Sequence, residues 1–318
     1  MNLNHGDMPM EELERYQGCS PCPPDFDEFW DASLEEMRTV NPNVELIPNE
    51  FLKVPFAECF DMYFTGVGGA RIHAKYIRPK NFDKPCPAML KFHGYAWNAG
   101  DWNDKLSYAA MGYCVAALDC RGQGGFSEDN GSIKGPTLRG HIIRGLDDKP
   151  EKMVFRQIYL DTAQLANIIM GFPEVDKNDV SAAGESQGGA LALVCGALET
   201  RIKKIAPVHP YLSDFKRYWY LDAQDELIEY FRFFDPMHLH EEEVFAKLGY
   251  IDIQNLVKRI RGEVMFTTGL LDKVCPPSTQ FAAYNKITSP KRMLLYHDYG
   301  HEFYPQLNDH IYKFICNA

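Results

Sequence analysis

The feature that most constrains the fold of this chain is a serine flanked by glycines at a boundary between a strand and a helix. Residues 179–183 have the composition of a short buried strand, and residues 189–194 form an apolar stretch suited to the start of a buried helix. Between them lies Gly184-Glu185-Ser186-Gln187-Gly188. Glycines two residues before and after the serine keep side chains from clashing in a sharp strand-to-helix turn. Glycines also surround serines in ordinary loops, but this context predicts that the Ser186 hydroxyl is held out of a sheet as a nucleophile.

Short apolar runs alternate with helical patterns along most of the chain. Apolar residues at helical spacing predict a helix over residues 154–170. Strand-like segments occur at residues 53–56, 59–65, 71–78, 88–92, 113–118, 179–183, 204–208, 263–268 and 292–296. Alternation of this kind is typical of a parallel sheet with helices on both faces. Together with the serine turn, it predicts an α/β-hydrolase fold with a mostly parallel, eight-stranded sheet flanked by helices.

A single domain with two additions is expected for the length of 318 residues. Residues 1–50 are predicted to form an N-terminal helical arm, in which an apolar stripe indicates a helix over residues 25–38. Residues 211–261 interrupt the alternation with many aromatic and acidic side chains, and we expect a helical insertion near the active site. The aromatic side chains either form a small core of the insertion or contribute one or two members to the pocket lining.

Charge and composition disfavour several classes of function. The formal net charge of −11 disfavours binding to nucleic acid or to anionic membranes. No apolar run reaches the length of a bilayer span, and residues 1–14 lack the pattern of a secretory signal, so we expect a cytoplasmic protein. Cys19 and Cys22 resemble half of a metal site, but no second ligand pair follows them. We therefore predict no metal and expect the nine cysteines to be free thiols, unless an oxidising compartment joins this pair.

A serine hydroxyl becomes an effective nucleophile only when a base accepts its proton and a third group orients that base. In the predicted fold an acid and then a histidine follow the serine, each after a late strand. Asp272 and His301 each follow one of the last two predicted strands, so we predict Asp272 as the acid and His301 as the base. His297 fits a structural role at the strand end. Asp298 is a rival acid, but it shares the loop of His301 and fits a turn or a helix cap better.

Acyl transfer also needs hydrogen-bond donors aimed at the developing oxyanion. The backbone N–H of Gln187, directly after the serine, is the first predicted donor. The second is the backbone N–H of Tyr95, in the loop His93-Gly94-Tyr95 that follows the strand at 88–92. The alternative is that this loop is an ordinary turn.

The segment Asp119-Cys120-Arg121-Gly122-Gln123-Gly124-Gly125 follows the strand predicted at 113–118. Its glycines do not have the spacing of a dinucleotide fingerprint, and the Lys-Ser/Thr pair of a phosphate-binding loop is absent, so we predict no nucleotide cofactor. A structural role is favoured, in which Arg121 makes bidentate hydrogen bonds to a carboxylate near the serine turn.

Three motifs resemble the signatures of carbohydrate esterase family seven, the acetyl xylan esterases and cephalosporin C deacetylases. They are Arg121-Gly-Gln-Gly-Gly125, Gly184-Glu-Ser-Gln-Gly-Gly189 and His301-Glu302. The stretches 25–30, 92–95, 140–148 and 275–281 are also similar to the family, so the resemblance covers nearly the whole chain. Ser186, Asp272 and His301 fall where the family places its catalytic triad.

This resemblance implies cofactor-free deacetylation of small acetylated substrates, including xylo-oligosaccharides and cephalosporin C. It also implies a homo-hexamer with active sites facing an internal cavity, in which the loop at 125–148, with His141, Ile142, Ile143 and Arg144, would be an interface element. Trp97 is bulkier than expected so close to Tyr95, the second predicted oxyanion donor. Its effect on the acyl-size limit is open.

Three other functions fit the same fold. A serine peptidase would need a recognition site for an amine terminus, which often lies on an added domain. The sequence predicts no large added domain, which disfavours a peptidase. An acyltransferase would differ by excluding water from the same triad. A non-catalytic binding protein would have a broken triad, whereas all three predicted members are present.

Overall fold

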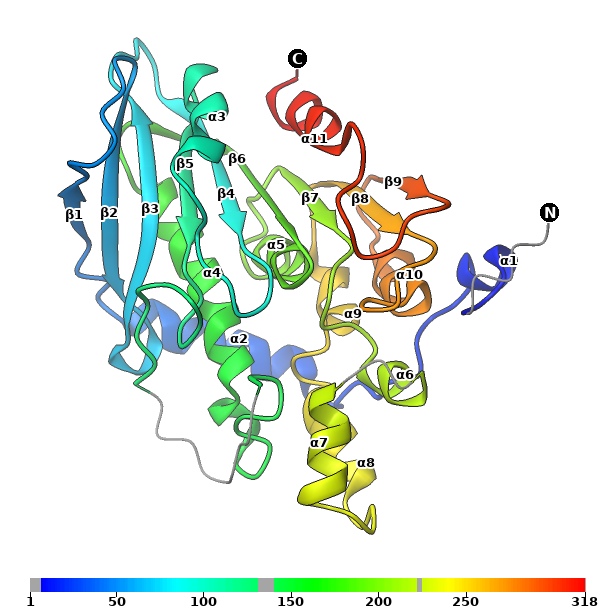
Figure 1. Ribbon diagram of the computed structural model, residues 1–318. Coiled ribbons are helices and arrows are strands. Elements are labelled where there is room, and N and C mark those ends of the chain that lie inside the picture. The colour runs from blue at the N-terminus through cyan, green and yellow to red at the C-terminus, as the bar shows by residue number, and fades with distance from the viewer. Residues whose placement is uncertain (1–6, 131–139, 222–224, 318) are drawn as a thin grey trace.

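A nine-stranded β-sheet forms the centre of the computed structural model, which describes residues 7–130, 140–221 and 225–317 (Figure 1). The strands are β1 (Glu45–Pro48), β2 (Ala57–Thr65), β3 (Arg71–Pro79), β4 (Cys86–Phe92), β5 (Cys114–Leu118), β6 (Val175–Glu185), β7 (Lys204–Val208), β8 (Glu263–Gly269) and β9 (Lys291–Tyr296). Their order across the sheet is β1-β2-β3-β5-β4-β6-β7-β8-β9. All pairs from β5 to β9 are parallel, and the pairs among β1, β2, β3 and β5 are antiparallel. The prediction of a mostly parallel sheet is confirmed.

Helices connect the parallel strands and extend the two ends of the chain. The α-helices are α1 (Met10–Leu13), α2 (Phe26–Thr39), α3 (Leu106–Ala110), α4 (Val154–Met170), α5 (Gln187–Leu198), α6 (Phe215–Tyr220), α7 (Asp225–Phe233), α8 (Glu241–Leu248), α9 (Ile253–Leu256), α10 (Pro277–Lys286) and α11 (Leu307–Cys316). Short 3₁₀ helices occur at Val67–Gly69, Asn103–Lys105, Pro150–Lys152 and Val257–Arg259. The helices predicted at 25–38 and 154–170 correspond to α2 and α4.

Each face of the sheet has its own hydrophobic core. The larger core joins one face to α2, α4 and α5, and the second joins the opposite face to α3 and α11 (Figure 1). Alternate residues of β4 divide between them, with Leu90 in the larger core and Met89 in the second. Because both faces are covered, β5 and β7 are buried at every position.

The antiparallel edge of the sheet differs from the sequence prediction. The described residues form nine strands rather than eight, because part of the predicted arm pairs with β2 as the edge strand β1. The strand predicted at 53–56 is wrong, since this segment is irregular. Pro55 within it lacks the N–H that a strand ladder needs, whereas Pro48 ends an edge strand, where a missing donor costs little.

The insertion at 211–261 contains α6 to α9, and residues 222–224 within it lie outside the described part of the chain. Figure 1 shows α7 and α8 projecting beyond the carboxyl ends of the parallel strands. The Phe231 ring lies 4.7 Å from the Trp219 ring and 6.0 Å from the Phe245 ring, measured between centroids. These aromatic side chains therefore pack on one another within the insertion, and Phe231 and Phe245 are continuous with the larger core of the sheet.

The first part of the N-terminal arm, from Asp7 to Leu13, lies against the insertion and α10, and residues 1–6 lie outside the described residues. The Asp7 carboxylate accepts hydrogen bonds from the Arg217 guanidinium at 2.7 Å and from the Ser278 backbone N–H at 2.7 Å. The Asn285 amide donates to the Leu13 carbonyl at 2.8 Å. Polar contacts therefore attach the arm to two separate elements.

Two observations concern the environment of the chain. Within the described residues, no helix combines the length and the apolar character that crossing a membrane requires. The nine cysteines are free thiols, of which six are buried, one is partly buried, and Cys19 and Cys22 are exposed.

Candidate active site

Ser186 lies in the turn between β6 and α5, which we call the serine turn (residues 184–189). Its backbone has φ 56° and ψ −119°, a strained conformation for a residue with a side chain. A Cβ atom at Gly184 would lie 2.5 Å from the Phe92 carbonyl oxygen, and one at Gly188 would lie 2.1 Å from the same oxygen. The end of β4 therefore approaches the turn too closely for any side chain at these two glycines.

His301 joins Ser186 to Asp272. Its Nε2 lies 3.2 Å from Ser186 Oγ, and its Nδ1 lies 2.9 Å from Asp272 Oδ2. Because an ionised carboxylate only accepts hydrogen bonds, Nδ1 carries the proton, and the lone pair on Nε2 is left to accept the serine proton. The three predicted residues, separated by up to 115 positions along the chain, thus lie within hydrogen-bonding distance.

The Asp272 carboxylate is 3% exposed and is fixed by its own loop. Its Oδ1 accepts hydrogen bonds from the backbone N–H groups of Val274 at 2.9 Å and Cys275 at 2.8 Å. The rival residues His297 and Asp298 are both exposed, and the carboxylate in contact with His301 belongs to Asp272.

The two predicted oxyanion donors lie at the ends of β4 and β6. Gln187 is the first residue of α5, so the dipole of this helix also favours negative charge near Ser186. Tyr95 belongs to residues 93–100, which we call the oxyanion loop. Neither backbone N–H has an acceptor among the described residues. Both amides are thus free to bind an oxygen atom of a substrate.

An open pocket of about 550 Å³ contains Ser186 and His301, a volume within the range of small-ligand sites. Its lining residues are Gly94, Tyr95, Trp97, Glu185, Ser186, His209, Val274, His301, Glu302 and Phe303. Trp97 and Phe303 are 66% and 71% exposed, so their rings lie at the pocket mouth. Trp97 therefore lies at the rim and leaves the serine accessible.

Sequence analysis missed His209, which directly follows β7 and lines the pocket. Its ring lies 4.2 Å from the His301 ring, and its Nδ1 lies 3.1 Å from the Tyr304 hydroxyl oxygen. Burial, and then the charge of His301, lower the pKa of His209 to about 3, so its ring is neutral at physiological pH. Its position at the carboxyl end of a parallel strand was the signal that could have identified it.

The loop at 119–125 packs against the oxyanion loop. Gln123 Oε1 accepts a hydrogen bond from the Ala96 N–H at 2.9 Å, and its Nε2 donates to Gln187 Oε1 at 2.8 Å. The Gly124 N–H donates to the Trp97 carbonyl at 2.9 Å. Gln123 thus connects the oxyanion loop to the first residue of α5, a role that sequence analysis did not assign.

Arg121 makes the bidentate interaction expected from the sequence. Its Nε and Nη2 donate to the two Asp161 carboxylate oxygens at 2.7 and 2.6 Å, and both side chains are buried. Asp161 belongs to α4, which packs against α5, the helix that begins at the serine turn. Burial lowers the pKa of Arg121, but the Asp161 carboxylate outweighs it and holds this pKa above its ordinary value.

The insertion reaches the site through an acidic residue. Glu226 of α7 accepts a hydrogen bond from the Tyr95 hydroxyl and another from the Ile142 N–H at 2.7 Å. Ile142 and Ile143 are 0% and 3% exposed in this chain, so they belong to its own core rather than to a free apolar surface. Residues 131–139 of the same expected interface loop lie outside the described residues.

Comparison with known proteins identifies the relatives of this chain. The model of the acetyl xylan esterase (AXE1) family matches residues 3–318. The structure of acetyl xylan esterase 1 from Thermoanaerobacterium sp. JW/SL YS485 is similar with a TM-score of 0.96 and 56% identity, covering 98% of this chain and 99% of that one. The acetyl xylan esterase from Paenibacillus sp. R4 has a TM-score of 0.93 and 34% identity, covering 97% and 99%.

A longer curated relative is also similar. Acetyl esterase Axe7A of Xylanibacter ruminicola is 30% identical over 285 residues, which cover 86% of this chain. The chain spans 62% of the length of that relative.

Proposed function

The chain belongs to the acetyl xylan esterase family, a family of carboxylic ester hydrolases, and from this premise we propose that it is a serine esterase that deacetylates small acetylated substrates. The observation that carries the proposal is the Ser186–His301–Asp272 set, with its hydrogen-bonding distances of 3.2 and 2.9 Å, in an open pocket. Short acetylated xylo-oligosaccharides are the first substrate class, and the acetyl group of cephalosporin C is the second.

In the first half of the reaction, Ser186 Oγ attacks the acetyl carbonyl carbon while His301 Nε2 accepts the hydroxyl proton. The carbonyl oxygen becomes an oxyanion, which accepts hydrogen bonds from the Tyr95 and Gln187 backbone N–H groups. The carbon–oxygen bond to the sugar then breaks. His301 returns its proton to the leaving alkoxide, and an acetyl-enzyme remains.

In the second half, a water molecule takes the place of the sugar hydroxyl. His301 removes a proton from this water as its oxygen attacks the acetyl carbon, and the bond to Ser186 breaks as the proton passes to Oγ. Acetate leaves, and Asp272 stabilises the imidazolium ion in both halves. The buried Asp272 carboxylate, held by two backbone N–H groups, is suited to orient the ring in each half.

The experiment measures acetate release from acetylated xylo-oligosaccharides and from cephalosporin C, beside a butyrate ester and a dipeptide amide. Ser186→Ala should lower kcat/KM on the order of 10⁶-fold, because the triad members act as a unit. Ser181→Ala is the matched control. It makes the same change to a buried serine of β6 whose hydroxyl has no hydrogen-bond partner among the described residues, and it should leave activity unchanged.

The outcomes distinguish the competing functions. Near-normal turnover by Ser186→Ala would refute the serine mechanism. Cleavage of the dipeptide amide without acetate release would indicate a peptidase, and acetyl transfer to an added alcohol in preference to water would indicate an acyltransferase. No turnover of any substrate, with retained binding, would indicate a binding protein.

The proposal extends to a cytoplasmic homo-hexamer that acts on short oligosaccharides rather than on polymeric xylan. Light scattering of the purified protein tests the oligomeric state, and fractionation of the native cells tests the location. A monomer with equal activity on polymeric and short acetylated xylan would contradict this extension.

A further inference from the structure

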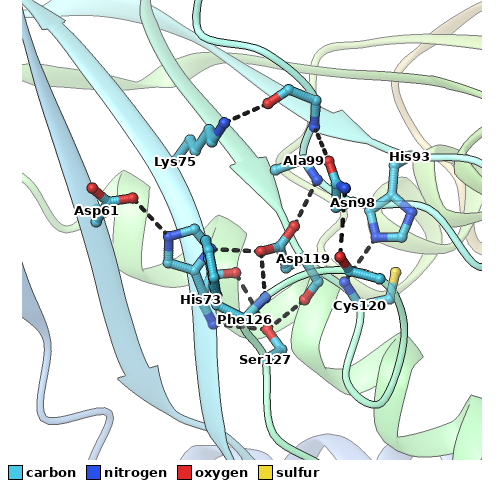
Figure 2. Close-up of polar contacts among 12 residues, drawn as sticks. Asp61, His73, Lys75, His93, Asn98, Ala99, Asp119, Cys120, Phe126 and Ser127 are labelled. Atoms are coloured by element: carbon cyan, nitrogen blue, oxygen red, sulfur yellow. Dashed lines mark hydrogen bonds and ion pairs between the residues drawn. The ribbon is translucent and has the colours of Figure 1, made fainter. Parts of the chain in front are cut away.

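A buried carboxylate lies behind the oxyanion loop without contacting the pocket. Asp119 directly follows β5 and is 2% exposed. Figure 2 shows its carboxylate between His73 and Ala99. It accepts hydrogen bonds from His73 Nδ1 at 2.6 Å, the Ala99 N–H at 2.6 Å and the Phe126 N–H at 2.9 Å. Three donors thus converge on one buried acid.

His73 connects this acid to a second carboxylate. Its ring is fully buried on β3, and its Nε2 lies 3.1 Å from Asp61 Oδ1 (Figure 2). The nearby Ser127 hydroxyl donates to the Asp119 backbone carbonyl at 2.6 Å and accepts from the His73 backbone N–H at 2.8 Å. Because this hydroxyl is engaged with backbone groups and both ring nitrogens face carboxylates, the cluster is not a second nucleophilic site. The remaining role for this cluster of His73, Asp119 and Ser127 is to hold the neighbouring oxyanion loop in position.

The cluster holds the oxyanion loop at two places. Asp119 binds the Ala99 N–H near the far end of the loop, and the next residue, Cys120, donates its N–H to His93 Nε2 at 2.9 Å at the near end (Figure 2). Lys75, two residues after His73 on β3, donates to the Gly100 carbonyl. The loop is therefore anchored to β3 and to the end of β5 on both sides of Tyr95.

One of these anchors acts on the direction of the predicted oxyanion donor, together with the Trp97 N–H, which also donates to the Gly94 carbonyl at 3.2 Å. Because His93 Nε2 accepts the Cys120 N–H, the ring proton is on Nδ1, which donates to the Gly94 carbonyl at 2.7 Å. Burial lowers the pKa of His93, which agrees with a neutral ring. The Gly94 C=O and the Tyr95 N–H belong to one planar trans peptide group, so fixing the carbonyl fixes the opposite direction of the N–H.

We propose that Asp119 and His73 are positioning residues that aim the Tyr95 backbone N–H at the oxyanion, an inference that rests on the proposed serine esterase function. The Asp119 carboxylate holds Ala99, and Asp119 directly precedes Cys120, whose N–H holds His93 and, through it, the peptide group of Gly94 and Tyr95. The donor is then in place before the reaction and needs no reorganisation when charge develops. His73 keeps the Asp119 carboxylate oriented. Asp119, His73 and Asp61 lie in a row, with Asp61 at its outer end.

The test uses Asp119→Asn in the full chain, assayed with an acetyl ester and with methylboronic acid, whose tetrahedral serine adduct places an oxygen at the oxyanion position. An amide cannot accept from His73, Ala99 and Phe126 together. We expect kcat to fall about ten- to hundredfold, less than the 10²–10³ that follows complete loss of one donor. The KM should stay within about threefold, and the boronate inhibition constant should rise by the same factor as kcat falls.

Glu174→Gln is the matched control. Glu174 is a buried carboxylate at the amino end of β4, where it accepts hydrogen bonds from the Tyr76 hydroxyl at 3.0 Å and from Arg78 at 3.1 Å. This variant should lose thermal stability, as Asp119→Asn does, with kcat and boronate affinity unchanged. An equal loss of kcat in both variants would reduce the role of Asp119 to general stability and overturn the proposal.

A second variant covers the case in which Asp119→Asn does not fold. Asp61 is partly exposed at the outer end of the row, so Asp61→Asn should fold and should lower kcat and boronate affinity together by about two- to fivefold. Unchanged values for both would overturn the proposal. Failure of the serine esterase function itself is recognised separately, because Ser186→Ala would then retain its activity.

Discussion

The serine turn and the oxyanion loop form two halves of one site, but different forces hold them. The serine turn is fixed by backbone packing, since a Cβ atom at Gly188 would lie 2.1 Å from the Phe92 carbonyl oxygen. The oxyanion loop is fixed by hydrogen bonds that its backbone N–H groups donate to distant residues, among them Asp119 and Gln123. A geometry set by backbone contact should fail completely when it is changed, whereas one set by several hydrogen bonds should weaken in steps.

The largest effect is expected at the serine turn, from Gly188→Ala. The new methyl group overlaps the Phe92 backbone, which cannot move without distorting β4, so the free energy of unfolding should fall by about 3 kcal/mol or more. Activity should fall below detection. Gly112→Ala is the control, because its Cβ meets open space and only its φ of 84° is unfavourable. The free energy of unfolding of this control should fall by about 1 kcal/mol, and its activity should be unchanged. Equal urea midpoints for the two variants would contradict packing as the cause.

The next effect concerns pH on the serine side of the site. The pKa of His209 is about 3 in the folded state, below the ordinary value of 6.5, so the unfolded state binds more protons between these values. This contribution to stability is intact above pH 6.5 and is lost as the pH falls toward 3. Between pH 7 and pH 4.5 the loss should be on the order of 2 kcal/mol. Urea unfolding at both pH values should show a smaller loss for His209→Asn, and an unchanged loss would contradict the assignment.

A stepwise effect is expected from Gln123→Ala, which removes the connection between the two halves. Losing the acceptor for the Ala96 N–H leaves the oxyanion loop with its remaining anchors, so kcat should fall about tenfold with KM unchanged. The free energy of unfolding should change by about 1 kcal/mol. Steady-state kinetics and urea unfolding measure both quantities. Gln123→Glu, which keeps the acceptor for Ala96, should recover part of kcat, and equal kinetics of the two variants would exclude this hydrogen bond as the cause.

The smallest effect is expected at the pocket mouth, from Trp97→Ala. The ring is 66% exposed and its backbone keeps the contact with Gly124, so the oxyanion loop should retain its position. The KM for an acetylated xylo-oligosaccharide should rise about threefold through loss of contact with a sugar ring, while the kinetics for a small acetate ester stay unchanged. A fall in kcat for the small ester would show that the side chain contributes to the loop geometry after all.

The contrast between the halves also explains what the sequence could predict. The serine turn is contiguous, so two glycines, a serine and the flanking apolar runs were enough to locate it. Asp272 and His301 could be assigned because each follows a late strand, and the parallel order brings strand ends together. The strands from β2 to β9 were predicted on the same basis, whereas the short edge strand β1 was missed because four residues carry little periodicity.

The supports of the oxyanion loop could not be found in this way. His73 lies on β3, whereas Asp119 and Gln123 belong to the loop that follows β5, and only the pairing of β3 with β5 brings His73 next to that loop. Their hydrogen bonds depend on side-chain directions that no local pattern contains. His209 was missed for a related reason, since nothing in its neighbourhood along the chain indicates that its ring stacks on His301.

The distribution of free thiols gives the two halves separate chemical reporters. Cys120 is buried beneath the oxyanion loop, and Cys275 is buried beside Asp272, near the serine turn. Burial, followed by nearby carboxylate charges, raises the pKa of both thiols, so a disulfide reagent reacts with them only after local opening. The labelling rate at each cysteine would therefore measure how often each half opens. One folded chain thus carries its own comparison of local stability on the two sides of a single pocket.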